Sequence, residues 1–127
     1  MSTANDMNVL ADRLMRAIET GDLETARACY GPDARIWHNF DGLAQTVDEN
    51  LRTLKWMDKR LTNRRYEVLS RHVFEGGYVQ QHVLHGTLNN KEAFTMPACL
   101  VVTVKDGKIA RLDEYLDTAH TLPLRRA

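Results

Sequence analysis

The sequence lacks an excess of either charge: its 127 residues include 17 Lys and Arg and 17 Asp and Glu, for a formal net charge of zero. Proteins that bind nucleic acids usually carry a basic excess or stripe, so we expect no nucleic-acid partner. No apolar run approaches the ~20 residues that span a bilayer, and the first residues lack the basic and apolar segments of a secretory signal. We therefore expect a cytoplasmic protein that does not enter the membrane.

Motifs for metals, redox chemistry and phosphates are also missing. Cys29 and Cys99 lack the CxxC spacing of a redox or zinc site. The five histidines form no HExxH or His-x-His pair, and His82 and His85 would face opposite sides of a strand. Gly76-Gly77 is typical of a turn rather than a phosphate-binding loop. We expect no metal and no cofactor.

The chain is long and apolar enough for one folded domain over residues 1–127, since 43% of its residues are hydrophobic. Residues 6–21 place apolar side chains at helical spacing between an aspartate cap and a glycine stop. Asp22 can cap a second, short helix that ends at Gly31-Pro32. The segment Thr46 to Glu49 has the capping-box pattern of a third helix, in which hydroxyl and carboxylate satisfy free amides reciprocally.

From Leu61 onward the apolar period changes to two, which is typical of strands. Turn residues divide this half of the chain at Gly76-Gly77, Asn89-Asn90 and Asp106-Gly107. We expect strands at residues 34–39, 66–74, 78–88, 94–104 and 108–117. Helices followed by a meander define an α+β fold, here a curved antiparallel sheet packed on three N-terminal helices.

The strand at residues 94–104 is apolar on both faces. One face carries Phe94, Met96, Ala98, Leu100 and Val102, and the other carries Pro97, Cys99 and Val101. An antiparallel sheet with one wet face normally alternates cleanly, so both faces should be covered. The helices can cover one face, and a second copy of the chain is the simplest cover for the other. We therefore expect a homodimer.

The strand register predicts a polar cluster on one face. If Asp106-Gly107 and Asn89-Asn90 both form two-residue hairpins, Cys99 lies opposite both Gln80 and Glu114. Paired residues share a face, and the predicted face carries Gln80, His82, Cys99 and Glu114 among Leu84, Val101, Leu112 and Leu116. A few polar groups in an apolar field are typical of a ligand pocket. A slip of one residue in either turn would break this prediction.

Glu114 and His82 are the candidates for acid–base chemistry. An apolar cavity disfavours the charged form of a carboxyl group and moves its pKa toward neutrality, where it can accept or donate a proton. Histidine titrates in the same range. The alternative is that these two side chains form an ordinary structural pair or face solvent.

Three segments, together with the order of elements, resemble the nuclear transport factor 2-like superfamily over nearly the whole chain. They are residues 19–24 (ETGDLE), residues 30–39 (YGPDARIWHN) and residues 105–117 (KDGKIARLDEYLD). Within that superfamily the chain resembles the SnoaL-like branch, which includes polyketide cyclases, ketosteroid isomerases, limonene epoxide hydrolases and scytalone dehydratases. The resemblance implies a cone-shaped α+β barrel with a deep pocket, a homodimer, and catalysis without metal or organic cofactor.

The resemblance also carries over some site residues. Glu114 falls where the epoxide hydrolases have an acid in the last strand. Trp37-x-Asn39 is similar to their Tyr-x-Asn pair, whose polar groups hold the attacking water, although an indole donates and cannot accept as a phenol does. The Asp of their third strand falls near Leu84 and is missing. His38 and His82 resemble the histidines of the dehydratases.

Two functions of different classes follow. The first is an enzyme (an isomerase, dehydratase, cyclase or hydrolase) acting on a small hydrophobic, oxygenated molecule. Glu114 and His82 would move protons, and His38 and Asn39 would orient water or a carbonyl group. We expect the pocket wall to include Trp37, Gln80, Leu84, Cys99, Val101, Leu112 and Leu116. The second function is a non-catalytic module that binds a small molecule or serves dimerisation, because fold alone does not decide function.

Overall fold

Two helices, a strand and a third helix precede a four-strand meander, in the order that the sequence predicts. A computed structural model describes residues 3–127. Its elements are α1 (Ala4–Thr20), α2 (Leu23–Ala28), β1 (Tyr30–His38), β2 (Ala44–Gln45), α3 (Val47–Asp58), β3 (Leu61–Phe74), β4 (Gly77–Leu88), β5 (Ala93–Lys105), β6 (Lys108–Leu116), the 3-10 helix η1 (Thr118–Thr121) and α4 (Leu122–Arg126). The short elements β2, η1 and α4 are additions to the predicted set.

The strands form one curled sheet in the order β2-β1-β6-β5-β4-β3. The meander from β3 to β6 is antiparallel, as predicted, but β1 lies parallel to β6, so the sheet as a whole is mixed. A parallel pair needs a long crossover between its strands, and the whole of α3 and the meander supply it. The predicted α+β class, with a curved sheet packed on N-terminal helices, is confirmed.

The helix caps follow the sequence signals closely. Thr46 and Glu49 form the predicted capping box of α3, and Asp22 caps α2 through the amide of Thr25. The first helix begins earlier than predicted. Thr3 is its N-cap, and Asp6, the residue expected in that role, is instead the third helical residue that closes a second capping box.

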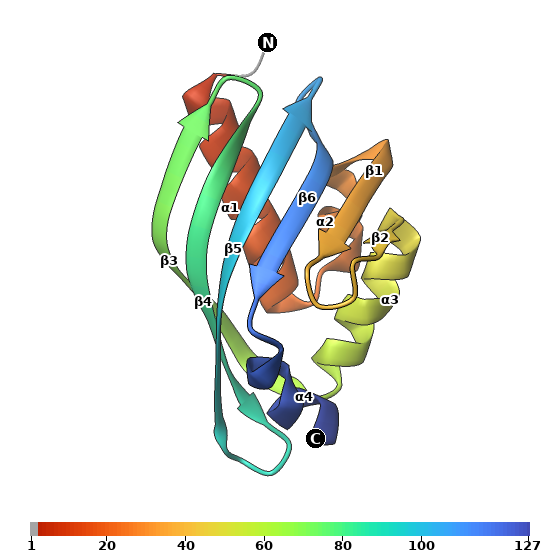
Figure 1. The fold of residues 1–127 in the computed structure, drawn as a ribbon, viewed down its shortest axis with the longest axis vertical. Helices are drawn as coiled ribbons and strands as arrows, with labels where there is room; N and C mark the ends of the chain where they lie inside the picture. Colours follow the sequence, from red (N-terminus) through yellow and green to blue (C-terminus); the bar gives the residue numbers. More distant parts are fainter. Residues whose placement is uncertain (1–2) are drawn as a thin grey trace.

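Helices α1 and α2 lie behind the sheet in Figure 1, and α3 lies beside it, next to β1 and β2. The helix α1 contacts β3 and buries an apolar stripe that includes Leu10, Ala11, Leu14 and Ile18. Each large side chain buried in this way stabilises the fold by about 1.5–3 kcal/mol. The concave face of the sheet therefore holds the core. Within residues 3–127, no helix is long and apolar enough to cross a membrane.

The strand register confirms the predicted hairpin at Asp106-Gly107 but differs from the predicted pairing of β5 with β4 and β6. Lys105 pairs with Lys108 around a two-residue turn, as expected. The turn at Asn89-Asn90, however, contains a third residue, Lys91, which adopts a left-handed conformation (φ 74°). In β6, a bulge at Ala110 adds one further residue opposite β5. Each of these extra residues shifts the pairing with β5 by one position.

Both shifts move β5 by one residue relative to its neighbours. The alignment of β4 with β6 therefore stays as predicted, and only the side chains of β5 change place. Gln80 and Glu114 still share a face, opposite Leu100 instead of Cys99. The predicted positions of Cys99 and Val101 are therefore wrong, and both side chains lie on the outer face of the sheet. The reason is that side chains alternate with a period of two, so one extra residue moves a strand's side chains to the other face.

The outer face of the sheet is the side turned toward the viewer in Figure 1, where the strands are drawn without a helix in front of them. Trp37 and Tyr115 pack edge to face here, with ring centroids 5.3 Å apart. Tyr115 is 46% exposed, and Cys99 and Val101 are half-buried beside it on β5. We call these four side chains the outer patch.

The chain after β6 folds back against the end of the sheet. Asp117 caps η1 through the amide of Ala119, and α4 begins with proline in its first turn. Leu124 is buried in the core cluster. This C-terminal segment also forms part of the wall around the site.

Candidate functional site

A cavity of about 650 Å³ opens between α3, the concave face of the sheet and the C-terminal segment. Its apolar wall includes Leu54 and Met57 of α3, Leu84 and Leu116 of the sheet, and Leu124 of α4. Figure 1 shows α3 and α4 near the same end of the sheet. This volume lies within the range of small-molecule sites.

A narrow recess of about 60 Å³ lies deeper in the fold, against α1 and the middle of the sheet. It shares five wall residues with the larger cavity: His38, Asn50, Leu54, Tyr66 and Glu114. Four of these five carry polar groups. A ligand whose apolar body fills the larger cavity would therefore meet a ring of polar groups at its inner end.

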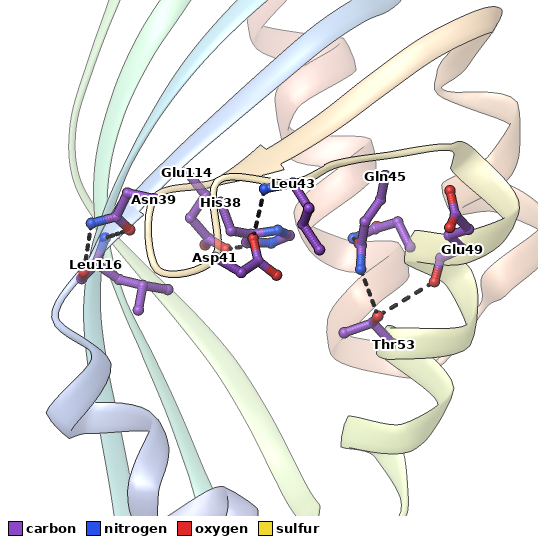
Figure 2. A network of polar contacts seen from close by, with 10 residues as sticks. His38, Asn39, Asp41, Leu43, Gln45, Glu49, Thr53, Glu114 and Leu116 are labelled. Carbon is purple, nitrogen blue, oxygen red and sulfur yellow. Dashed lines mark hydrogen bonds and ion pairs between the residues drawn. The ribbon is translucent and has the colours of Figure 1, made fainter.

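His38 and Glu114 are joined at this inner end (Figure 2). They are register partners in the parallel pair β1–β6, and His38 Nε2 lies 3.1 Å from Glu114 Oε1. Burial disfavours the imidazolium of His38, but the hydrogen bond and charge of Glu114 and the charge of Asp41 outweigh it. The net effect raises the pKa of His38 above its ordinary value. The pair can therefore hold and transfer a proton near neutral pH.

His82 has a different environment. Its ring is 2% exposed, and its Nδ1 lies 2.8 Å from the amide nitrogen of Gln80. Burial and the charge of Arg71 lower its pKa, and the charge of Glu114 only partly opposes them. This lowered pKa favours the neutral imidazole of His82, which lies at the wall of the recess.

Tyr66 of β3 lines both cavities, and sequence analysis missed it. Its ring packs edge-on to His82, with centroids 4.8 Å apart. Burial, with smaller contributions from Glu114 and Glu19, raises the pKa of its phenol, so the hydroxyl stays protonated and can donate. The sequence signal was present as an aromatic in a strand, but only the β3–β4 pairing of Tyr66 with Leu84 brings it to the site.

Asn50 of α3 is the second wall residue that sequence analysis missed. It is buried, and its amide nitrogen donates to Gln45, whose own amide nitrogen donates to Thr53. Figure 2 shows Gln45 and Thr53 on the α3 side of the site, across from Glu114. Asn50 thus adds a polar side chain to the wall of both cavities.

Residues 11–112 of the chain match the family model of the SnoaL-like domain. The chain belongs to the SnoaL-like family. A comparison with curated proteins finds no significant match.

Solved structures with the same fold include three of particular interest. PrhC from Penicillium brasilianum superimposes with a TM-score of 0.87 at 12% identity, covering 98% of this chain and 89% of PrhC. IdmH from Streptomyces antibioticus, a proposed polyketide cyclase, gives 0.81 at 19% identity, covering 94% and 98%. An epoxide hydrolase of M. tuberculosis, similar to limonene epoxide hydrolase, gives 0.76 at 16% identity, covering 96% and 91%. At these identities the likeness shows the fold alone.

This SnoaL-like domain places only some of the predicted site residues around the cavities. Leu84 and Leu116 line the larger cavity, Leu112 and His82 line the recess, and His38 and Glu114 line both. Gln80 is buried on the same face but bonds to its neighbours instead of facing either cavity. Cys99 and Val101 belong to the outer patch, as the corrected register requires.

Trp37 is not part of the wall, contrary to prediction. Ile36 and His38 face the core, so Trp37 between them must face outward, because side chains alternate along a strand. It packs on Tyr115 instead. The Trp37-x-Asn39 resemblance therefore does not supply a water-holding pair.

Asn39 also has a structural task. Its amide nitrogen donates to the carbonyl of Leu116 at 3.1 Å, and its amide oxygen accepts from the backbone amide of Leu116 at 3.0 Å. Figure 2 shows the side chain turned to Leu116 and away from the His38–Glu114 pair. The side chain is held against the backbone of Leu116 and lines neither cavity, so its role in orienting water stays a prediction.

The donor set of the site does not resemble a metal centre. Among the described residues, no group of three or more His, Cys, Asp or Glu side chains is arranged to hold a metal ion. The polar groups at the junction of the two cavities are the joined His38–Glu114 pair, the hydroxyl of Tyr66 and the amide of Asn50, and His82 adds a further polar group in the recess.

Proposed function

We propose that this SnoaL-like domain is an enzyme that moves protons on a small hydrophobic, oxygenated molecule without a resident metal or organic cofactor. The observation that carries the proposal is the His38–Glu114 pair at the junction of the cavity and the recess. Positioned acid–base groups typically contribute about 10²- to 10⁴-fold to the rate, and this pair is positioned at the inner end of a ligand-sized space.

The reaction class that fits best is proton abstraction beside a carbonyl group. Glu114 takes the proton from carbon, the C–H electron pair forms a new C=C bond, and the π pair of the carbonyl group moves onto its oxygen. Tyr66 and His82 donate hydrogen bonds to that oxygen, which stabilises the developing charge. His38 holds Glu114 in place and can return a proton at a second position. Isomerases, dehydratases and aldol-type cyclases share this first step.

Hydrolysis is the less favoured class, because the residue expected to hold the attacking water is Asn39. Its amide bonds to the backbone of Leu116, and the residue lines neither cavity. Proton abstraction beside a carbonyl group does not require a bound water molecule. The site therefore fits proton abstraction better than hydrolysis.

The test measures proton abstraction directly. Ligands are first selected from a panel of cyclic ketones, enones, β-hydroxy ketones and epoxides by their effect on the melting temperature, since binding to the native state raises it. The selected ketones are then incubated with protein in D₂O, and deuterium uptake beside the carbonyl is followed by mass spectrometry. Glu114→Gln is expected to slow the exchange by about 100-fold or more.

Glu67→Gln is the matched control. Glu67 also pairs with a histidine, His85, at 2.8 Å, but this pair is more exposed and lines neither cavity. The control should leave the exchange unchanged. If ligands bind but wild-type protein exchanges deuterium no faster than Glu114→Gln, the domain is a binding module and not an enzyme.

We also propose that the outer patch is the contact surface of a homodimer. Trp37, Tyr115, Cys99 and Val101 lie on the sheet face opposite the helices, around Asp113, which pairs in register with both Trp37 and Val101. Exposed apolar side chains gathered in this way commonly mark protein contacts. Light scattering should give the mass of a dimer for the wild type and of a monomer for Tyr115→Lys. Val9→Lys, at an exposed position of α1, is the control and should remain dimeric. A monomeric wild type would refute the proposal.

A further inference from the structure

A chain of polar contacts runs from the surface to His82 through the core side of the sheet. Asp12 of α1 binds Arg71 of β3 at 2.9 Å. Arg71 Nε donates to Gln80 Oε1 at 2.9 Å, and Gln80 Nε2 lies 2.8 Å from His82 Nδ1. Three of the four side chains are buried or nearly so, and only Asp12 is largely exposed. Burying such a set is costly unless each bond is made.

Arg71 determines which way the Gln80 amide points. A guanidinium group only donates hydrogen bonds, so the Gln80 atom facing Arg71 must be the oxygen. The amide nitrogen then faces His82 and also lies 3.4 Å from the sulfur of Met15, a weak acceptor. The orientation of this amide is therefore set by its neighbours on both sides.

The Gln80 amide in turn determines the tautomer of His82. An amide N–H that points at Nδ1 requires a lone pair there, so the proton of the neutral ring must sit on Nε2. A proton on Nδ1 would place two donors against each other at 2.8 Å. Within residues 3–127, the structure gives Nε2 no hydrogen-bond partner, and the ring lines the recess.

The other groups around His82 are compatible with this state. Arg71 and Tyr66 approach from β3, Met15 of α1 contacts the neighbouring Gln80, and the charge of Glu114 acts from β6. Arg71 is a fixed cation because Asp12 and the amide oxygen of Asn8 both bind it. A second positive charge on His82 would lie close to that cation in a buried setting.

We propose that Asp12, Arg71 and Gln80 are positioning residues that hold His82 as the neutral Nε2–H tautomer, so that it donates a hydrogen bond to a ligand oxygen in the recess instead of carrying a proton. The tautomer stands on the contacts alone, and the role toward a ligand oxygen rests on the proposed function. This assignment separates the two histidines of the site: His38 with Glu114 transfers protons, and His82 stabilises an oxygen. The substrate class that it specifies is a carbonyl compound whose oxygen reaches the recess.

The first test reads the tautomer without any substrate. Nitrogen-15 NMR of histidine-labelled protein at neutral pH should show His82 with a protonated Nε2 and an unprotonated Nδ1. Gln80→Glu replaces the amide by a group of the same shape that only accepts, so His82 should shift to carry a proton on Nδ1. Gln81→Glu, at an exposed position on the opposite face of β4, is the matched control and should leave His82 unchanged.

A second variant keeps the test decisive if Gln80→Glu folds poorly. Gln80→Leu removes the donor to Nδ1, and His82 should then show a mixture of tautomers. A wild-type His82 with its proton on Nδ1 would overturn the proposal. So would an unchanged Nε2–H tautomer in both Gln80 variants.

The second test measures the role toward the ligand with the deuterium-exchange reaction. Gln80→Glu should lower kcat about 100-fold, the loss expected when one donor to a developing oxyanion is removed, with a smaller effect on KM. If the tautomer flips but kcat is unchanged, the donor role of His82 is refuted while the tautomer relay stands. If the wild type shows no exchange at all, the proposed function fails and the NMR result remains independent of it.

Discussion

His38 and Glu114 are direct partners in a parallel strand pair, and their side chains meet 3.1 Å apart on the concave face of the sheet. The strands β1 and β6 that carry them are separated in the chain by α3 and the rest of the meander. The pair therefore forms only when the last strand has joined the sheet. Each residue lacks this partner in any fragment that omits the other strand, so the acid–base pair depends on the completed fold.

The charge of Glu114 controls the protonation of His38. We expect the pKa of His38, which is raised in the wild type, to fall in Glu114→Gln, because burial is then opposed only by the charge of Asp41. An NMR titration of the labelled histidine ring measures both values. Glu67→Gln serves as the control and should leave His38 unshifted, while an equal pKa in wild type and Glu114→Gln would contradict the assigned pair.

The same pair should make stability depend on pH. A histidine whose pKa is higher in the folded than in the unfolded state stabilises the fold fully below the unfolded pKa, and this contribution disappears as pH rises through the folded pKa. The difference in unfolding free energy between wild type and Glu114→Gln should therefore be largest below the pKa of His38 in the unfolded chain and shrink as pH rises through its raised pKa in the folded protein. Urea unfolding at a series of pH values measures it. A difference that grows with pH would contradict the sign.

The order of elements, the helix caps and the inward face of β4 and β6 could be predicted from the sequence, because each depends on local spacing. The pairing of β5 with β4 and β6 could not be predicted in this way. Lys91 occupies a left-handed position without being glycine, and Ala110 is an ordinary apolar residue at a bulge. Neither carries a local sequence signal, yet each shifts the register by one residue.

Tyr66 and Asn50 illustrate a second limit. They reach the site through the β3–β4 pairing and the packing of α3, which are tertiary features without a motif. Trp37 illustrates an error of the opposite kind. The family resemblance predicted that Trp37 and His38, which are consecutive residues of one strand, both face the same pocket. The alternation of side chains along β1 excludes that arrangement.

The corrected register can be tested by stability. Val102 is fully buried opposite Leu112, whereas Val101 lies on the outer face. Val102→Ala should lower the free energy of unfolding by about 2 kcal/mol, since it leaves a cavity in the core. Val101→Ala should cost less than about 1 kcal/mol in the monomer. Chemical unfolding of both variants in the Tyr115→Lys background removes any contribution of the proposed dimer, and the reverse order of the two losses would refute the register.

Asn39→Ala should reduce stability more than it reduces chemistry. The substitution leaves the amide and carbonyl of Leu116 without their partner, which costs about 1–3 kcal/mol for groups that remain buried. Deuterium exchange per folded molecule should stay within a few-fold of the wild type. A large loss of exchange at unchanged melting temperature would instead show that Asn39 acts on the ligand.

Tyr66→Phe separates the donor role of Tyr66 from its packing role. The ring that packs on His82 is retained, and the hydroxyl has no hydrogen-bond partner among residues 3–127, so the variant should fold with unchanged stability. Removing a donor to a developing oxyanion costs about 10²- to 10³-fold in kcat, and a loss of this order is expected in the exchange reaction. Tyr66 and His82 would both donate to the same oxygen, and donors that serve one atom are not independent. The loss of kcat in the double variant Tyr66→Phe/Gln80→Glu should therefore be smaller than the product of the two single losses. Full multiplicativity would show that the two side chains contact different parts of the ligand.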